Sequence, residues 1–328
     1  MAKVAVIGAT TWGNSVAMLL AQKKKVPVNI LTRTETKAKE LKRKQQERIS
    51  GTGFPDCVLF TSSASEALQD VEFVIFAVPA QSMRQSVKGI RDYVTPTMIL
   101  VSLAKGLEAD SGKRMSEVIA DEVISGIAQK ICVLSGPNLA KEVDQGLPAT
   151  SVVASQDIQV AKRVQALLDS PTFSVFISDD IVGVELCGAL KNVIALGAGI
   201  FDGLKLGNNA KAAFIAIGWS EVIALGMALG AKQATFWGLA GLGDLIATGN
   251  SPLSRNHYVG YELGKGRSLA DIMASMSNVA EGIDTTMATH HLATRLRLEL
   301  PTITMVYQVL FESLAPIELV KRLRDGVS

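Results

Sequence analysis

The chain has 328 residues, of which 48% are hydrophobic and 20% are charged, a balance typical of a globular protein with about two domains. Lys and Arg number 33 against 31 Asp and Glu, for a formal net charge of +2, so no basic excess indicates nucleic-acid binding. Cys57, Cys132 and Cys187 are widely separated. This spacing excludes a disulfide framework and a CxxC metal motif, and it favours the reducing cytoplasm. The N-terminal run predicts a strand and not a signal peptide.

The first half of the chain alternates short β-branched runs with helical stretches. The predicted strands are Lys3–Ile7, Val28–Thr32, Val58–Thr61, Phe73–Val78, Met98–Leu103, Ile131–Leu134, Thr150–Ala154 and Phe173–Ile177. The helices predicted between the first six are Asn14–Lys24, Thr36–Ile49, Gln81–Tyr93 and Lys113–Ile124. Apolar strands that alternate with helices indicate an α/β fold, a doubly wound, Rossmann-like parallel sheet covered on both faces.

After about Asp179 the strand signals stop and helices separated by Gly, Asn and Pro follow. The predicted helices include Ile181–Gly199, Asn209–Leu229, Ala280–Arg295 and Ile303–Ser313. We therefore expect a dinucleotide-binding domain over residues 1–178 and an all-helical substrate-binding domain over residues 179–328. The apolar stretches 181–201 and 212–229 contain charged residues, which favours buried core helices over membrane spans.

A glycine-containing turn follows the first predicted strand. Its sequence is Gly8-Ala9-Thr10-Thr11-Trp12-Gly13, and the helix that follows offers free N–H groups to a pyrophosphate. Thr10 stands where the dinucleotide fingerprint has its middle glycine, so its Cβ is expected to push the pyrophosphate outward unless the hydroxyl replaces a lost backbone contact. The turn alone therefore leaves open a strand–turn–helix that binds nothing.

The end of the second strand bears on the choice of dinucleotide. Its sequence is Ile30-Leu31-Thr32-Arg33, with no acidic residue at the tip to bind the ribose 2′-hydroxyl of NAD. A guanidinium suits a 2′-phosphate instead. Arg33 therefore favours NADP, and because Glu35 is close, NAD stays possible.

Two lysines are candidates for the chemistry. Lys105 follows the strand 98–103, at the edge where doubly wound sheets bind ligands. Lys191 lies in an apolar helix rich in small residues, on the same face as Gly188 and Ala195. Burial of Lys191 beside a second ammonium group such as Lys105 would lower its pKa and make it a usable acid or base.

Polar groups elsewhere complete the set. Asp244 follows Gly241-Leu242-Gly243 and is placed to orient a lysine or a substrate hydroxyl, whereas Ser254-Arg255-Asn256 at a predicted helix start suggests a phosphate clamp. Ser135-Gly136-Pro137-Asn138 ends a further strand at the same sheet edge.

These motifs and their order resemble those of the soluble NAD(P)-dependent glycerol-3-phosphate dehydrogenases of the bacterial or plastid kind. The matching motifs are Gly8…Trp12-Gly13, Lys105-Gly106-Leu107-Glu108, Ser135-Gly136-Pro137, Leu190-Lys191-Asn192-Val193, Ala240-Gly241-Leu242-Gly243-Asp244-Leu245, Ser254-Arg255-Asn256 and Val279-Ala280-Glu281-Gly282. The chain departs from the family pattern at three places. Thr10 replaces the middle glycine, Asn138 stands where the family usually has Ser or Thr, and the stretch between Arg33 and Val58 matches the family's loop poorly.

The resemblance implies a role for each matching position. Lys191 would be the general acid and base, acting with Lys105 and Asp244. The residues implied to bind dihydroxyacetone phosphate or sn-glycerol 3-phosphate are Lys105, Gly136, Asn138, Lys191, Asp244, Ser254, Arg255 and Asn256. Those implied to bind NAD or NADP are Gly8, Thr11, Trp12, Gly13, Arg33, Lys105, Ala140, Arg255, Val279 and Glu281. No metal is implied, a homodimer is expected, and the product would supply phospholipid synthesis.

Two other functions stay open. Another two-domain NAD(P) dehydrogenase acting on a hydroxy acid would have a similar fold, but the Gly-Leu-Gly-Asp and Ser-Arg-Asn motifs speak against it. A non-catalytic dinucleotide-binding protein would accommodate the altered turn at Thr10. The set Lys105, Lys191, Asp244 and Arg255 speaks against that alternative.

Overall fold

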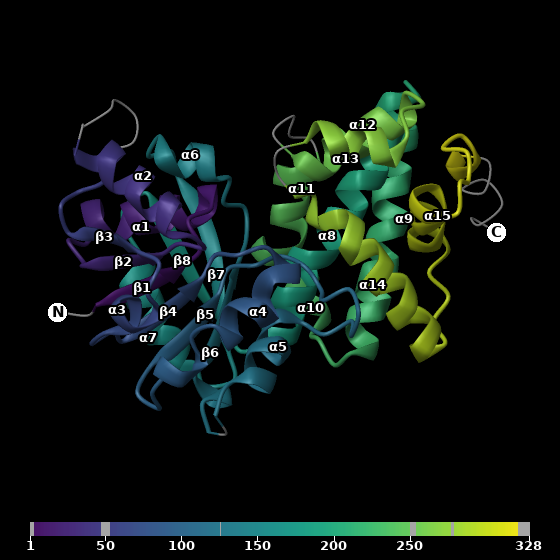
Figure 1. Ribbon diagram of the computed structural model, residues 1–328. Coiled ribbons are helices and arrows are strands. Elements are labelled where there is room, and N and C mark those ends of the chain that lie inside the picture. Colours follow the sequence, from purple (N-terminus) through teal and green to yellow (C-terminus); the bar gives the residue numbers. More distant parts are fainter. Residues whose placement is uncertain (1–2, 47–52, 125, 250–253, 277–278, 321–328) are drawn as a thin grey trace. The chain divides into compact units, whose positions relative to one another are not determined.

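The computed structural model describes residues 3–46, 53–124, 126–249, 254–276 and 279–320 (Figure 1). The chain divides into two compact units. Residues 1–104 and 115–181 form the first unit, and residues 105–114 and 182–328 form the second. The segment 105–114 thus packs with the helical unit, although in sequence it lies inside the predicted dinucleotide-binding domain.

The first unit is built on one eight-stranded sheet in the order β3-β2-β1-β4-β5-β6-β7-β8. The strands are β1 Val4–Ile7, β2 Val28–Leu31, β3 Val58–Thr61, β4 Phe73–Phe76, β5 Ile99–Ser102, β6 Ile131–Ser135, β7 Ala149–Ser155 and β8 Phe173–Ser178. All eight predicted strands are present, with ends within two residues of the prediction. The order of β1 to β6 is that of a Rossmann sheet, which reverses between β1 and β4.

The last two strands, which were predicted without a direction, depart from the parallel pattern of the others. β1 to β6 pair in parallel, but β7 pairs with β6 in antiparallel fashion, and β8 is parallel to β7. The connection from β6 to β7 contains only the five-residue helix α6, Ala140–Asp144. A parallel pair needs a longer crossover over the sheet face, whereas this short return places β7 beside β6 in the opposite direction.

Helices cover both faces of the sheet because successive strand residues are apolar, so both faces of the strands are apolar. Val4 and Val6 pack with one apolar cluster, and Ala5 and Ile7 pack with the other. The helices of this unit are α1 Thr11–Lys23, α2 Glu35–Gln46, α3 Ala64–Leu68, α4 Met83–Lys88, α5 Met115–Glu122, α6 and α7 Ile158–Leu168, with the 3-10 turns η1 Ala80–Ser82, η2 Arg91–Tyr93 and η3 Ala128–Lys130.

The helical predictions for this unit are partly wrong. The single helix expected over 81–93 is three short elements, η1, α4 and η2, and α4 ends at Gly89, which is its C-cap. α2 matches the helix expected over 36–49 as far as Gln46, and the last three residues of that prediction lie outside the described residues. The helices α3, α6 and α7 were not predicted.

The second unit is helical, as expected. Its helices are α8 Ile181–Gly203, α9 Gly207–Ala228, α10 Gln233–Trp237, the π-helical turn η4 Leu239–Gly243, α11 Asp244–Gly249, α12 Arg255–Gly264, α13 Leu269–Ser275, α14 Glu281–Leu296 and α15 Pro301–Phe311. Pro301 occupies the first turn of α15, where its missing N–H costs nothing.

Two of these helices, α8 and α9, are long and apolar enough to cross a membrane by length and composition alone. The most apolar 18-residue window of α8 is 94% buried, which confirms the prediction of a core helix. For α9 the prediction holds in part, because the helix buries one face but only 39% of the corresponding window is buried. One face of α9 is exposed in this chain.

Candidate active site

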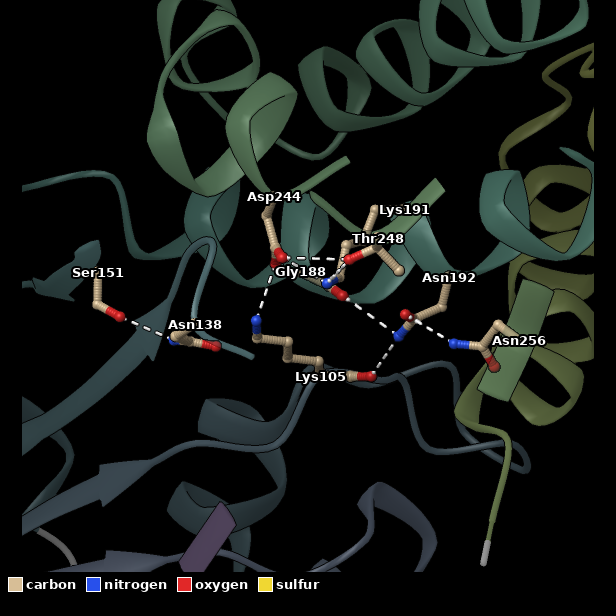
Figure 2. A network of polar contacts seen from close by, with 9 residues as sticks. All are labelled: Lys105, Asn138, Ser151, Gly188, Lys191, Asn192, Asp244, Thr248 and Asn256. Atoms are coloured by element: carbon tan, nitrogen blue, oxygen red, sulfur yellow. Dashed lines mark hydrogen bonds and ion pairs between the residues drawn. The ribbon is translucent and has the colours of Figure 1, made fainter. Parts of the chain in front are cut away.

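Lys191 lies on the core helix α8 and is only 5% exposed. Its Nζ is 2.5 Å from Asp244 Oδ1 and donates to Thr248 Oγ1 at 2.6 Å (Figure 2). Asp244, the first residue of α11, follows the π-helical turn η4, and Thr248 lies one turn further along the same helix. α11 therefore presents a carboxylate and a hydroxyl side by side to one buried ammonium group.

Lys105 shares the same carboxylate. Its Nζ is 2.9 Å from Asp244 Oδ2, so each oxygen of Asp244 faces one lysine. The segment 105–114 that carries Lys105 is fastened to α8 at two points: Asn192 Nδ2 donates to the Lys105 carbonyl at 3.0 Å, and Arg114 is 2.7 Å from Glu185. The structure thus brings together the three residues predicted to be catalytic.

The surroundings of Lys191 change its acidity. Its pKa is lowered to about 7, chiefly by burial and also by the nearby ammonium of Lys105, while the charge of Asp244 opposes this shift. The direction agrees with the sequence prediction, although burial is a larger cause than the second ammonium. A lysine with a pKa near 7 is present in both protonation states at neutral pH, so it can donate or accept a proton.

A chain of amides continues from this cluster. Asn192 accepts at 2.8 Å from Asn256 Nδ2, and Asn256 Oδ1 accepts from the backbone N–H of Gly282 at 2.9 Å. Asn256 is 8% exposed. These contacts join the segment 105–114, α8, α12 and α14. The carboxamide predicted to hold a phosphate is thus engaged with its own protein on both its oxygen and its nitrogen.

The N-terminus of α12 carries the rest of the predicted phosphate clamp. Ser254 is the N-cap, and its hydroxyl accepts from the His257 N–H at 3.2 Å. Arg255 is exposed, and its guanidinium makes no hydrogen bond or ion pair with any residue that the structure describes. α12 lies directly against α8, because a Cβ on Gly260 would stand 1.8 Å from the Leu196 carbonyl oxygen. The guanidinium of Arg255 is available to an anion.

In the first unit, the predicted dinucleotide turn runs from β1 into α1. Gly8 has φ +106°, and Gly13 is the third residue of α1. Thr11 is exposed at the first position of the helix. The Trp12 ring packs on the core beside Phe173, and its buried Nε1 has no hydrogen-bond partner among the described residues.

Arg33 lies just beyond the end of β2 and is exposed. It has no ion pair with the residues described here. Glu35, the nearest acid in sequence, accepts from the Ser62 hydroxyl at 2.6 Å and faces Lys39 at 3.8 Å. The positive charge of Arg33 is therefore unopposed by its nearest acid in sequence.

The remaining predicted residues fall in both units. Gly136 and Asn138 follow β6 in the first unit, where Asn138 Nδ2 donates to Ser151 Oγ at 2.7 Å, and Ala140 begins α6 (Figure 2 shows the Asn138 pair). Val279 and Glu281 belong to the second unit, at the start of α14.

Sequence reasoning missed two members of the cluster. Thr248 stands four residues after Asp244, and this helical spacing was a signal that the two side chains share one face. Asn192 was quoted in a motif but given no role. Its two contacts, to the Lys105 carbonyl and to Asn256, depend on residues far away in the chain, so no local pattern reveals them.

Within the described residues, no three His, Cys, Asp or Glu side chains are grouped to hold a metal ion. Two histidines have other partners. His257 Nε2 is 2.8 Å from Asp202, and the His290 ring stacks on Tyr307.

Comparisons with known proteins agree along the chain. The sequence model described as NAD-dependent glycerol-3-phosphate dehydrogenase N-terminus matches residues 3–161, and its C-terminal counterpart matches residues 180–321. A protein of Dehalococcoides mccartyi (strain ATCC BAA-2100 / JCM 16839 / KCTC 5957 / BAV1) named glycerol-3-phosphate dehydrogenase (NAD(P)+) is 48% identical over 99% of this chain and 91% of its own length.

Two further relatives give the same result. A protein of the same name from Chlorobium limicola (strain DSM 245 / NBRC 103803 / 6330) is 42% identical over 94% of this chain and 93% of its own length. The crystal structure of glycerol-3-phosphate dehydrogenase from Coxiella burnetii has a TM-score of 0.90 and 32% identity, and the match covers 99% of each chain.

Proposed function

The chain belongs to the NAD-dependent glycerol-3-phosphate dehydrogenase family, and we propose that it interconverts dihydroxyacetone phosphate and sn-glycerol 3-phosphate. It is an oxidoreductase with NAD or NADP as its cofactor. The observation that supports the proposal most is the buried pair of Lys191 and Asp244, in which a lysine with a pKa near 7 is held by a carboxylate.

We assign the proton transfer to Lys191. When bound, the reduced dinucleotide supplies a hydride to the carbonyl carbon, and the substrate oxygen then needs a proton. Lys191 as an ammonium donates that proton and becomes neutral, and in the oxidising direction neutral Lys191 accepts the hydroxyl proton. Asp244 and Thr248 fix the position of its Nζ, and the charge of Lys105 stabilises negative charge that develops on the substrate oxygen.

The substrate phosphate is assigned to the start of α12. Arg255 is exposed and unpaired within the described part of the chain, and it stands at a helix N-terminus, where N–H groups and the helix dipole favour an anion. Within the part of the chain that the structure describes, the Ser254 hydroxyl accepts from the His257 N–H and donates to no protein group, so its proton can be donated to a phosphate oxygen. Asn256 contributes by holding α12 against α8 and α14.

The dinucleotide is assigned chiefly to the first unit, with the pyrophosphate at the Gly8–Gly13 turn and NADP preferred over NAD. The unopposed charge of Arg33 supports the preference, since a 2′-phosphate offers oxygens that a guanidinium binds. Arg33→Ala should weaken NADPH binding by at least tenfold while changing NADH binding by less than twofold. Equal losses in the two dissociation constants would contradict 2′-phosphate recognition.

The substrate is tested by turnover. NADPH and NADH oxidation should be fast with dihydroxyacetone phosphate and negligible with a panel of 2-keto acids. Turnover of a keto acid alone would favour the hydroxy-acid alternative, and tight dinucleotide binding without any turnover would favour a non-catalytic protein. The matched control is Lys191→Met, which keeps the length of the side chain but cannot transfer a proton.

We further propose a homodimer in the cytoplasm whose product supplies phospholipid synthesis. The exposed apolar face of α9 supports self-association. Three free thiols, Cys57, Cys132 and Cys187, are compatible with a reducing compartment, and burial raises the pKa of Cys132 to about 12. Cell fractionation with an antibody to the chain checks the location. In a strain depleted of this protein, isotope label that enters through dihydroxyacetone phosphate should be lost from the glycerol backbone of the lipids, which checks the supply.

A further inference from the structure

Thr10 occupies the position of the missing middle glycine. We propose that its side chain locks the Gly8–Gly13 turn in the conformation that receives the dinucleotide, and that Thr10 is thus a positioning residue for cofactor binding. This inference rests on the proposed assignment of the pyrophosphate to that turn.

The hydroxyl of Thr10 joins two separate parts of the backbone. Its Oγ1 donates to the Ala77 carbonyl at 2.7 Å and accepts from the Gly13 N–H at 3.1 Å. Ala77 directly follows β4, and its N–H donates to the Ile7 carbonyl at the end of β1 at 2.9 Å. One side chain therefore caps α1 and also ties the turn to the end of the neighbouring strand.

The turn is tightly packed around this link. A Cβ on Gly13 would stand 2.3 Å from the Gly8 carbonyl oxygen, and a Cβ on Gly8 would stand 2.9 Å from the Ala77 carbonyl oxygen. The backbone of the turn, the start of α1 and the end of β4 thus meet directly. A polar bridge at Thr10 fixes the distances among these three segments.

The two hydrogen bonds of the Thr10 hydroxyl bear on how this side chain affects pyrophosphate binding. The hydroxyl donates its single proton to the Ala77 carbonyl and accepts from the Gly13 N–H, so it has no proton left to donate to a pyrophosphate. The first helical bond runs from the Asn14 N–H to the Thr10 carbonyl at 2.9 Å. The N–H groups of Thr11 and Trp12 precede it and stay available to phosphate oxygens.

Glycine at this position would lack the bridge and would add backbone freedom to the turn. With Thr10 the turn is already ordered, so binding of the dinucleotide carries no further cost in backbone entropy there. The sequence expectation that a Cβ pushes the pyrophosphate outward is therefore replaced by the opposite expectation. Threonine should favour binding over glycine in this protein.

The test compares three substitutions by NADPH titration and steady-state kinetics of the full chain. Thr10→Val keeps the shape without the hydroxyl, and Thr10→Gly restores the fingerprint. Both should raise the NADPH Kd and KM roughly five- to tenfold, with kcat at saturating NADPH within about twofold of the wild type. Thr10→Ser keeps the hydroxyl and should bind like the wild type. Thermal melts identify any variant that fails to fold. If Thr10→Val fails to fold, the NADPH Kd values of Thr10→Ser and Thr10→Gly are compared instead to test the role of the hydroxyl.

A fourth variant separates this inference from the site assignment. Thr11→Glu places an acid in the first turn of α1, which suits the helix dipole but repels a pyrophosphate. If Thr11→Glu leaves the NADPH Kd unchanged, the turn does not hold the dinucleotide. If Thr11→Glu weakens binding while Thr10→Val and Thr10→Gly bind as tightly as the wild type, the role of Thr10 is overturned.

Discussion

The proton transfer that we propose for Lys191 predicts a pH dependence that differs between the two directions of the reaction. Its pKa is about 7, lowered mainly by burial. Reduction needs the ammonium form, so kcat/KM for dihydroxyacetone phosphate should fall about tenfold per pH unit above that value. Oxidation needs the neutral amine, so kcat/KM for sn-glycerol 3-phosphate should fall as the pH drops below it. Rate profiles measured in both directions over pH 5.5 to 9 check this.

The opposite signs provide the control for this prediction. A substrate phosphate also titrates near pH 6, but its ionisation affects binding in the same sense in both directions. Asp244→Asn removes the charge that raises the pKa of Lys191, so the reductive profile should move to lower pH as the rate falls. If kcat/KM changed with pH in the same sense in both directions, Lys191 would not be the group that transfers the proton.

At the scale of an element, we propose two different functions for adjacent residues at the N-terminus of α12, which are anion binding for Arg255 and helix docking for Asn256. Arg255→Ala removes an exposed charge, so it should raise the KM for dihydroxyacetone phosphate roughly 10- to 100-fold and leave the melting temperature nearly unchanged. Asn256→Ala leaves the Gly282 N–H and the Asn192 oxygen buried without a partner. It should lower the free energy of unfolding by roughly 2 to 4 kcal/mol.

The two variants are controls for one another, since they differ by one position on one helix. Substrate titrations and denaturant melts of both proteins separate anion binding from helix docking. A stable Asn256→Ala protein with only a raised KM would make that residue a phosphate ligand. An unchanged KM in Arg255→Ala would end its role as the clamp.

The elements themselves were predictable to different degrees. The strands were located well because each is a short, β-branched run bounded by turn residues, as in Val58–Thr61. Short helices such as α3 and α6 were not predicted, because five residues are too few to show a helical period in the sequence. The reversed direction of β7 also escaped, since a strand's composition carries no information on which way it runs.

At the scale of the whole molecule, the assignment of Lys105 to the helical unit could not be read from its position in the chain. The segment 105–114 leaves the first unit and returns, and it is held in the second by contacts to Asn192 and Glu185. Motif order suggested that Lys105 and Lys191 act together. Only the fold shows that Asp244 is the carboxylate between them.

The exposed face of α9 leads to a prediction about the assembled protein. Small side chains recur on it at every fourth position, which places them on one face of the helix. They are Ala212, Ala216, Ser220 and Ala224, all exposed. Beside them lies a hollow of about 460 Å³ lined by α9, α10, η4 and α11, with Trp237 56% and Ile246 58% exposed at its edge.

A second copy of the chain is the occupant that we expect for this face. Small residues let a symmetry-related helix approach closely, and the large apolar side chains bury area of the kind that stable dimers need, at least ~1,000 Å² in total. Light scattering after size exclusion should give twice the chain mass of 34.8 kDa. Ala216→Arg should give a monomer, because a guanidinium would be buried against its own copy. Ala166→Arg, the same exchange at an exposed helical position in the first unit, should remain dimeric. A monomeric wild type at every concentration, or a dimeric Ala216→Arg protein, would exclude this face as the interface.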